Sequence, residues 1–573
     1  MRIVITGIGV VSAIGDGKEA TLRSLLDERS GIAAPVWLPT PHREIPVGEV
    51  KHSNGELMAM LGIEQGVAIS RTSLLGIMAA REAVSDARVS EPERLFFVDG
   101  TTVGGMDYTE RHWAEKEKYA DRIVSVHSAG SSTGRIADHV ARFAGQTTVS
   151  TACSSALNAV ITACNMLRSG ECTQVLAGGA ESLSAFHFNG FRALQILSAE
   201  PCRPFSADRQ GLNLGEGAAY LVLETEECAI ARKVPIWAYV AGYGNACDAF
   251  HQTASSGNGE GAFLAMGKAL EMADIAPRQV GYINAHGTAT PNNDESETAA
   301  MLRLFGDDVP AFSSTKAFTG HATSAAGGIE LAVCLLAMRH GFVPAGLNWN
   351  VPMDNGLKPV LHTRKQKSDY VLCNSFGFGG NDSSLLLAAQ PADLPDRPLR
   401  EGVRRLADVE LHETADYKQY IGSLQARRLT PALRQLVVTA YKALEEAGIS
   451  VPDAVITATD LGCISNSVVL LDQLTQEGED ALKPTPFMQS THNTPSSLVA
   501  IQLHCHGYNC TYSHGGDSFS HALSDAERQI KLGLVDNALV LAFDEDEPAW
   551  RSLATLAGQP YHTAIRAVVL GKE

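Results

Sequence analysis

The sequence contains no apolar run long enough to cross a bilayer. Its longest apolar helical stretch, residues 327–338, is too short and contains Glu330. The opening residues, MRIVITGIGVVSA, lack the basic segment and the small-residue cleavage site of a signal peptide. A formal net charge of −18 argues against nucleic acid or an anionic membrane as a partner, although an acidic protein could bind a local basic patch. We therefore expect a cytoplasmic protein with no membrane span.

Cysteines are also missing from the arrangements that hold metals or disulfides. The eleven cysteines are scattered without paired spacing, which fits reduced residues of the interior. The one cluster to consider as a zinc site comprises His504, Cys505, His506, Cys510 and His514. These residues are expected on a helix end and a following strand, without the spacing of tetrahedral ligands. We therefore predict no metal site.

At 573 residues the chain is longer than one hydrophobic core usually supports, so at least two packed units are expected. Short apolar stretches alternate with amphipathic ones, which predicts a layered α/β architecture. Strands are predicted at residues 3–6, 147–151, 174–177, 219–223, 282–285 and 370–374. A helix is predicted over residues 154–168, and the Pro- and Arg-rich residues 391–409 are interpreted as a linker.

The segment after this linker repeats a pattern found near the start of the chain. Residues 431–449 share helical periodicity with residues 71–89. The stretch that begins at Gly516 likewise aligns with the stretch that begins at Cys153, and the same spacing leads to a helix-ending glycine in both. The last third is therefore predicted to be a shortened copy of the first third.

Cys153 lies in TACSSA, where a predicted strand turns into a predicted helix. The positive end of a helix dipole favours the thiolate, and the small neighbours would let a thioester approach the backbone. A lone cysteine among eleven would more often be a buried structural residue. Other motifs in the chain must therefore decide between the two interpretations.

Two histidine-containing turns change that balance. His286 lies in NAHGTATP and His321 in STKAFTGHATSAAGGIE, a segment that also supplies Lys316 and Glu330. Each turn follows a predicted strand and is built from small residues that would leave the imidazole accessible. Either histidine alone would more often be structural, but the occurrence of both with Cys153 favours a catalytic set.

These segments, together with NSFGFGG at residues 374–380, resemble the active-site motifs of the β-ketoacyl-acyl carrier protein synthases. The four motifs occur in the family's order, and the resemblance covers residues 1–390. It implies a thiolase-like fold, in which two similar α/β halves, residues 1–235 and 236–390, stack as five layers, αβαβα. Residues 410–573 would add a third, incomplete copy of the N-terminal half.

The resemblance implies an acyltransferase of the elongating 3-oxoacyl-[acyl-carrier-protein] synthase type, which performs a decarboxylative Claisen condensation. Cys153 would take the acyl chain from its thioester, while backbone N–H groups near Cys153 and Phe378 stabilise the oxyanion. His286 and His321 would hold the malonyl thioester carbonyl while carbon dioxide leaves. The resulting enolate would then attack the acyl group on Cys153.

Further residues match supporting roles in that family. Lys316 and Glu330 would form an ion pair that fixes His321. Thr288 and Thr290 resemble the hydroxyls that bind the phosphopantetheine arm of acyl carrier protein, and Phe378 resembles the family's gatekeeper. No tightly bound cofactor is implied.

The active-site residues also discriminate among relatives of the family. Thiolases have a second cysteine, and initiating synthases have Asn where His321 stands, so the set is of the elongating type. The sequence departs from the family at Asn381-Asp382, where Thr-Asn is usual, and at Thr101-Thr102, where Gly and Ser are usual beside the acyl pocket. Acyl chain length and unsaturation therefore stay open.

The last third has Gly516 in the position of Cys153 and no counterpart of the histidine turns. It resembles the inactive chain-length-factor subunits of polyketide and aryl polyene pathways, reduced to an N-terminal half. We predict that it takes the place of a partner's N-terminal half, with residues 510–513 pairing against residues 147–150. The result would be a dimer or an intramolecular pseudo-dimer, because the linker permits either.

Residues ahead of that strand, such as Phe487 and Met488, would close the far end of the acyl tunnel. A degenerate duplication that merely stabilises the fold is the alternative for this segment. For the whole chain, a non-catalytic carrier-protein-binding scaffold is the alternative to a condensing enzyme of fatty acid, polyketide or aryl polyene synthesis. Arg192 and Arg203 are candidate carrier contacts or, equally, structural salt-bridge partners.

Overall fold

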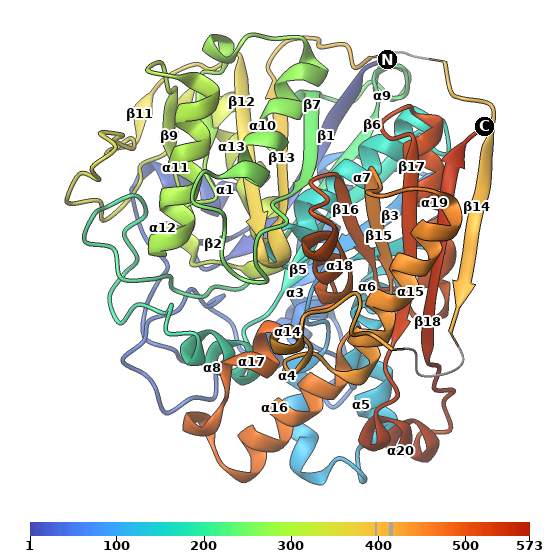
Figure 1. Cartoon of the computed structure of the whole chain (residues 1–573). Helices are drawn as coiled ribbons and strands as arrows, with labels where there is room; N and C mark the ends of the chain where they lie inside the picture. The colour runs from blue at the N-terminus through green and yellow to red at the C-terminus, as the bar shows by residue number, and fades with distance from the viewer. Residues whose placement is uncertain (396–397, 412–415) are drawn as a thin grey trace.

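The computed structural model describes residues 1–395, 398–411 and 416–573. Within these residues sixteen strands form one mixed sheet (Figure 1). Along it the strands run in the order β14-β18-β17-β15-β16-β4-β3-β5-β6-β1-β7-β13-β12-β8-β9, and β2 (Gly15–Asp16) pairs with β1. The sheet therefore passes through three successive strand groups. Two lie in residues 1–390, which are expected to hold the active site and are called here the catalytic part, and one lies in the last third.

The first group forms the N-terminal half. Its strands are β1 (Ile3–Ser12), β3 (Phe96–Gly100), β4 (Gly145–Val149), β5 (Gln174–Glu181) and β6 (Gly217–Thr225). Helices α3 (Arg71–Asp86) and α6 (Ala129–Val140) cover one face, and α7 (Ser155–Ser169) covers the other. Every residue of β1 is buried. A Cβ at Gly9 would lie 1.9 Å from the carbonyl oxygen of Ala79, so glycine lets α3 pack directly on this strand.

The second group forms the C-terminal half. Its strands are β7 (Ala238–Cys247), β8 (Tyr282–Asn284), β9 (Ala311–Ser313), β12 (Tyr370–Gly377) and β13 (Asn381–Ala388). Helix α13 (Ala326–His340) lies beside α7 between the two strand groups, and α10 (Glu260–Ala273) and α11 (Pro291–Phe305) form the outer layer. The five-layer αβαβα order implied by the family resemblance is confirmed.

Shorter elements connect these layers. They are α1 (Lys18–Leu26), α2 (Asn54–Leu61), α4 (Met106–His112), α5 (Ala120–His127), α8 (Ala185–Ala193), α9 (Glu226–Arg232), α12 (Lys316–Thr319), β10 (Phe342–Val343) and β11 (Arg364–Lys365). In the last third they are α14 (Ser423–Ala426), α16 (Ile464–Gln476), α17 (Pro484–Met488), α18 (Thr494–Leu503) and α20 (Pro548–Leu556).

The last third, called here the third unit, repeats the N-terminal half. Its strands are β14 (Val403–Glu410), β15 (Ala454–Ala458), β16 (Tyr508–Tyr512), β17 (Asn537–Asp544) and β18 (Ala564–Lys572). The order β14-β18-β17-β15-β16 reproduces β1-β6-β5-β3-β4, with the same parallel and antiparallel pairings. Helices α15 (Pro431–Ala447) and α19 (Ser518–Lys531) take the places of α3 and α7, so the predicted repeat is confirmed.

One boundary differs from the sequence-based expectation. Residues 403–409, interpreted as the end of a linker, belong to strand β14, which pairs with β18 along its length. This strand carries exposed arginines and acids because it forms the outer edge of the sheet. Because of these charged residues, the segment lacks the apolar pattern that predicts a strand from the sequence.

The third unit joins the N-terminal half through one short antiparallel contact. Tyr512 of β16 stands opposite Val149 of β4. The Ser150 N–H donates to the Thr511 carbonyl (2.9 Å), and the Ser513 N–H donates to the Thr148 carbonyl (3.0 Å). The predicted pairing of residues 510–513 with 147–150 is therefore present, and the structure makes it within a single chain (Figure 1).

The equivalent helices α7 and α19 differ in burial, because the third unit has no second half packed against it among the described residues. Helix α7 is buried from Ser155 to Leu167 because strands cover both of its sides. Helix α19 instead exposes Ser520, Ser524 and Glu527, and among the described residues no second strand group covers that side. Helix α19 is thus amphipathic, whereas the equivalent helix α7 is buried on every side.

Candidate functional site

Cys153 lies in a tight turn between β4 and α7. Ala152, directly before it, has a φ of 52°, and the Thr151 N–H donates to the Ser155 hydroxyl (2.8 Å). This turn places the thiol at the start of α7, and the side chain is only 5% exposed. The third unit forms the same turn with Gly515 (φ 58°) at the position of Ala152.

His321 lies beside the thiol, with its Nε2 3.1 Å from Cys153 Sγ. Its backbone is fixed because the N–H donates to the Asn213 carbonyl (2.8 Å) and the C=O accepts from the Gly215 N–H (2.9 Å). The His286 ring stands perpendicular to the His321 ring, with 5.3 Å between centroids. The three residues predicted to act together therefore share one buried site.

Lys316 and Glu330 form the predicted ion pair, and both side chains are buried. Its orientation differs from the prediction. Lys316 Nζ lies 3.3 Å from Nδ1 of His286, whereas Nδ1 of His321 has no hydrogen-bond partner among the described residues. The ion pair therefore holds His286 rather than His321, although the Lys316 charge acts on both rings.

Burial dominates the electrostatics of the site. It lowers the pKa of His286 and of His321 well below the ordinary range, and the positive charge of Lys316 adds to the effect. Burial also raises the pKa of Cys153 to about 11, although Lys316 and the N–H groups of Phe378 and Cys153 oppose it. At neutral pH the site therefore contains two neutral imidazoles and a protonated thiol.

Sequence reasoning missed Glu297 of α11. Its carboxylate accepts the N–H groups of His286 and Gly287, both at 2.8 Å, and the side-chain amide of Asn374 at 3.2 Å. Burial raises its pKa to about 7. Glu297 thus anchors the turn that carries His286. The only sequence signal was an acid in the helix that follows this turn, and Asp294 and Glu295 share that signal.

Phe378 begins the loop that separates β12 from β13. Its ring stacks on Phe191 of α8, with 5.6 Å between centroids, and its carbonyl accepts from the Asn493 side chain of the third unit (2.9 Å). Gly379 has a φ of 83°, and a Cβ there would lie 2.0 Å from the Ser497 hydroxyl oxygen. The third unit therefore packs directly against this loop.

A cavity of about 380 Å³ gives access to Cys153. Its lining includes His286, His321, Phe378 and the two threonines predicted to bind a phosphopantetheine arm, Thr288 and Thr290. The two threonine hydroxyl oxygens lie 2.9 Å apart. A pocket of this volume, lined by a thiol, two imidazoles and two hydroxyls, has the form of a small-molecule site.

The other candidate residues have structural contacts. Arg192 binds Asp480 (2.8 Å) and the Glu479 carbonyl (2.8 Å) of the third unit. Arg203 pairs with Glu200 and Asp208. In the part of the chain that the structure describes, no group of three or more His, Cys, Asp or Glu side chains could hold a metal ion. No helix there is long and apolar enough to cross a membrane.

The fold and the Cys-His-His set define a condensing enzyme of the acyltransferase class. Family models give the particular assignment. The beta-ketoacyl synthase N-terminal domain matches residues 1–229, the C-terminal domain matches residues 237–350, and a second N-terminal domain model matches residues 406–571. The chain belongs to the β-ketoacyl synthase family.

Individual relatives agree with this assignment. The chain is 32% identical over 412 residues to 3-oxoacyl-[acyl-carrier-protein] synthase 2 of Vibrio cholerae serotype O1, covering 67% of this chain and 98% of the relative. The solved ishigamide ketosynthase/chain length factor is 32% identical with a TM-score of 0.64, covering 68% of this chain and 99% of that one. The PfaC keto synthase-chain length factor is only 17% identical and shows the fold alone. Its superposition covers 100% of this chain and 78% of the PfaC chain, with a TM-score of 0.81.

The ion pair gives a first testable expectation. Lys316→Ala should lower the free energy of unfolding by roughly 3–5 kcal/mol, because it leaves the buried Glu330 carboxylate without its partner. Chemical denaturation would measure the loss. The double variant Lys316→Met/Glu330→Leu should recover most of the stability but not the activity, since it restores packing without the contact to His286. Unchanged stability in Lys316→Ala would contradict the buried pair.

Proposed function

We propose that this chain condenses an acyl group carried on Cys153 with a malonyl group carried on the phosphopantetheine arm of an acyl carrier protein. The observation that supports this most directly is the 3.1 Å approach of His321 Nε2 to Cys153 Sγ, with neutral His286 beside it in one cavity. No cofactor is needed for this chemistry.

In the first half-reaction, His321 accepts the thiol proton and the Cys153 sulfur attacks the acyl thioester carbonyl. The N–H groups of Cys153 and Phe378, both of which act on the sulfur in the free enzyme, stabilise the oxyanion. The new S–C bond forms as the bond to the carrier sulfur breaks. The carrier thiol leaves with the proton that His321 had taken.

In the second half-reaction, malonyl thioester occupies the space beside both histidines. The ammonium of Lys316 can only donate, so Nδ1 of His286 accepts from it and the imidazole proton lies on Nε2. That N–H stabilises the enolate as carbon dioxide leaves. His321 adds a second N–H once its ring proton lies on Nε2, which is free to donate because the acylated Cys153 has no thiol proton to give it. The enolate carbon then attacks the acyl carbonyl, and the carbon–carbon bond forms as the S–C bond to Cys153 breaks. The Cys153 thiolate takes up a proton from solvent and the thiol is restored.

The partners and setting belong to the same proposal. Acyl carrier protein appears in the name of the Vibrio cholerae relative, and Thr288 and Thr290 line the route its arm would take. The third unit favours polyketide or aryl polyene synthesis over general fatty acid synthesis, because it matches half of a second synthase. A cytoplasmic location completes the proposal.

Covalent loading tests this function against a non-catalytic scaffold. The full chain is incubated with an acyl thioester of carrier protein, and intact mass spectrometry followed by peptide mapping locates any adduct. An acyl group on Cys153 supports the enzyme, and malonyl-dependent chain extension completes the case. A scaffold would bind the carrier protein without acquiring the acyl mass.

The third unit also supplies a side chain behind the acyl pocket. Phe487 of α17 packs on Phe191 with 5.3 Å between ring centroids, and Phe191 in turn stacks on Phe378. A Cβ at Gly190 would lie 2.1 Å from the Phe487 ring, so glycine is required for this approach. Met488 is half-buried and lies outside the buried aromatic cluster of the described residues. We therefore propose that Phe487, rather than Met488, closes the far end of the acyl tunnel.

Phe487→Ala should shift the products toward longer chains, because Phe191 could then move into the vacated space. Chromatography with mass spectrometry of the released products would measure the shift. Met488→Ala is the matched control and should leave the distribution close to that of the natural chain. An unchanged distribution of product lengths in Phe487→Ala would show that Phe487 does not close the tunnel.

A further inference from the structure

Four buried asparagines from four different elements meet between the third unit and the catalytic part. They are Asn158 of α7, Asn245 of β7, Asn381 of β13 and Asn509 of β16, and each is at most 5% exposed. Asn381 is also the residue that replaces the family's usual threonine after the double glycine. The cluster therefore occupies a position where the sequence departs from its family.

The side chain of Asn245 binds the backbone of the third unit as a neighbouring strand would. Its Oδ1 accepts the Asn509 N–H (2.8 Å), and its Nδ2 donates to the Asn509 carbonyl (2.9 Å). The same Nδ2 lies 2.9 Å from Oδ1 of Asn158. Asn245 thus ties β16 to the helix that begins after Cys153.

Asn381 completes the connection. Its Nδ2 donates to the Asn509 carbonyl (2.8 Å), which directs its Oδ1 toward the nucleophile turn. There Oδ1 accepts from the Ser154 hydroxyl (2.9 Å) and from Asn158 Nδ2 (2.7 Å). The Nδ2 group of Asn158 can only donate. If the Asn381 amide were reversed, its own NH₂ group would face that donor, so this orientation of Asn381 is the one that satisfies both amides.

This geometry concerns the two oxyanion donors of the proposed mechanism. The N–H of Cys153 belongs to the nucleophile turn, and the N–H of Phe378 belongs to the loop that ends at Asn381. Asn381 joins the residue after Cys153 to the end of that loop. The carbonyl of Asn509 therefore fixes the two donors relative to each other from outside the catalytic part.

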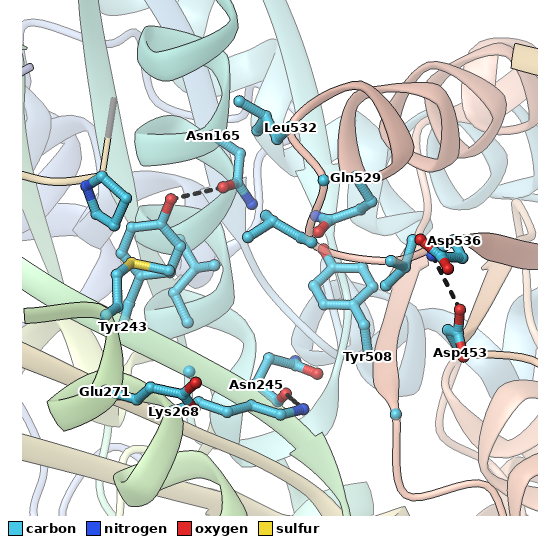
Figure 2. A pocket seen from close by; sticks show the side chains of 18 of the residues that line it. Asn165, Tyr243, Asn245, Lys268, Glu271, Asp453, Tyr508, Gln529, Leu532 and Asp536 are labelled. Carbon is cyan, nitrogen blue, oxygen red and sulfur yellow. Dashed lines mark hydrogen bonds between the residues drawn. The ribbon is translucent and has the colours of Figure 1, made fainter. Parts of the chain in front are cut away.

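A cavity of about 810 Å³ opens at the same seam (Figure 2). Asn165, Asn245 and Lys268 lie on its catalytic side, and Tyr508 and Gln529 lie on the side of the third unit. Lys268 Nζ donates to the Asn245 carbonyl (2.9 Å). Because Asn245 lines this space, water could replace its side chain there, whereas Asn381 is fully buried.

We propose that the asparagine cluster positions the oxyanion hole, so that the third unit is a working part of the active site for acylation of Cys153. Asn381 and Asn245 are positioning residues, because they act through the backbone of the nucleophile turn and of the Phe378 loop. The inference rests on the proposed function. It requires the cluster to affect acyl transfer and not malonyl decarboxylation, whose enolate is held by the histidines.

Asn381→Leu, in the full chain, tests this separation. The rate of Cys153 acylation, followed by mass spectrometry, should fall by about 10- to 100-fold, because displaced oxyanion donors lose part of their effect. The rate of carbon dioxide release from malonyl thioester should stay within about twofold of the unaltered chain. A mere loss of stability would lower both rates together.

Asn245→Ala provides a second variant that should fold, because water can reach its position. It should show the same separation with a smaller loss, and the double variant should acylate no more slowly than Asn381→Leu alone, since both act through one network. Asn165→Leu is the matched control, because it removes another buried amide from α7 on the same cavity. It should lower both rates equally or not at all.

The outcomes separate this inference from the proposed function. If the unaltered chain is not acylated, the proposed function fails. If it is acylated but folded Asn381→Leu and Asn245→Ala acylate at the same rate, or lose acylation and decarboxylation in proportion, the positioning role is overturned. Selective loss of acylation in both variants, absent from Asn165→Leu, supports it.

Discussion

Cys153→Ala should carry no acyl group and should lose condensation by about 10⁴-fold or more, because it removes the thiol proposed to hold the chain. The substitution replaces one small side chain by another in a turn whose backbone is fixed by Ala152 and Ser155. The melting temperature should therefore stay near that of the unaltered chain. Intact mass spectrometry after incubation with an acyl thioester measures the adduct, and a coupled assay measures extension.

Cys164→Ala is the matched control for this variant. Cys164 lies on α7, the helix that follows the Cys153 turn, is fully buried, and has a pKa that burial raises to about 12. It also lies outside the cavity that leads to Cys153. Its removal should leave the adduct intact. Condensation that survives in Cys153→Ala, or an adduct that moves to another cysteine, would refute the assignment of the nucleophile.

The parts of the site that could be predicted from the sequence are those built locally. Cys153, His286 and His321 each lie in a short turn of small residues, so the residues next to them in sequence largely determine the local backbone conformation. Glu297 was missed because its role depends on where α11 passes the His286 turn. A carboxylate on a helix is usually solvated, and nothing in the sequence marks this one as buried.

Contacts between distant segments were the least predictable. Lys316 and His321 are neighbours in sequence, which suggested that the ion pair fixes His321. The chain instead turns after Lys316, so the ammonium reaches the separate turn that carries His286. The asparagine cluster joins four elements that no periodicity connects. The repeat in the third unit was visible because helical periodicity and glycine spacing survive without any catalytic residue.

His286→Ala and His321→Ala should each slow malonyl decarboxylation by about 10²- to 10³-fold, because each removes one donor to the enolate. Their effects on acylation should differ. His321 lies against the thiol and is the proposed acceptor of its proton, so its loss should slow Cys153 acylation without abolishing it. His286 makes its polar contacts with Lys316 and the Glu297 carboxylate, so its loss should leave acylation nearly unchanged.

Asparagine at either position provides the control, because its amide keeps an N–H donor of similar reach. His286→Asn and His321→Asn should recover part of the decarboxylation lost in the alanine variants. Release of carbon dioxide from malonyl thioester measures that step separately from the acyl adduct on Cys153. Wild-type decarboxylation in either alanine variant would refute the assigned role. Equal loss of acylation in both would show that His286 also serves the thiol, although His321 is the histidine that lies 3.1 Å from the sulfur.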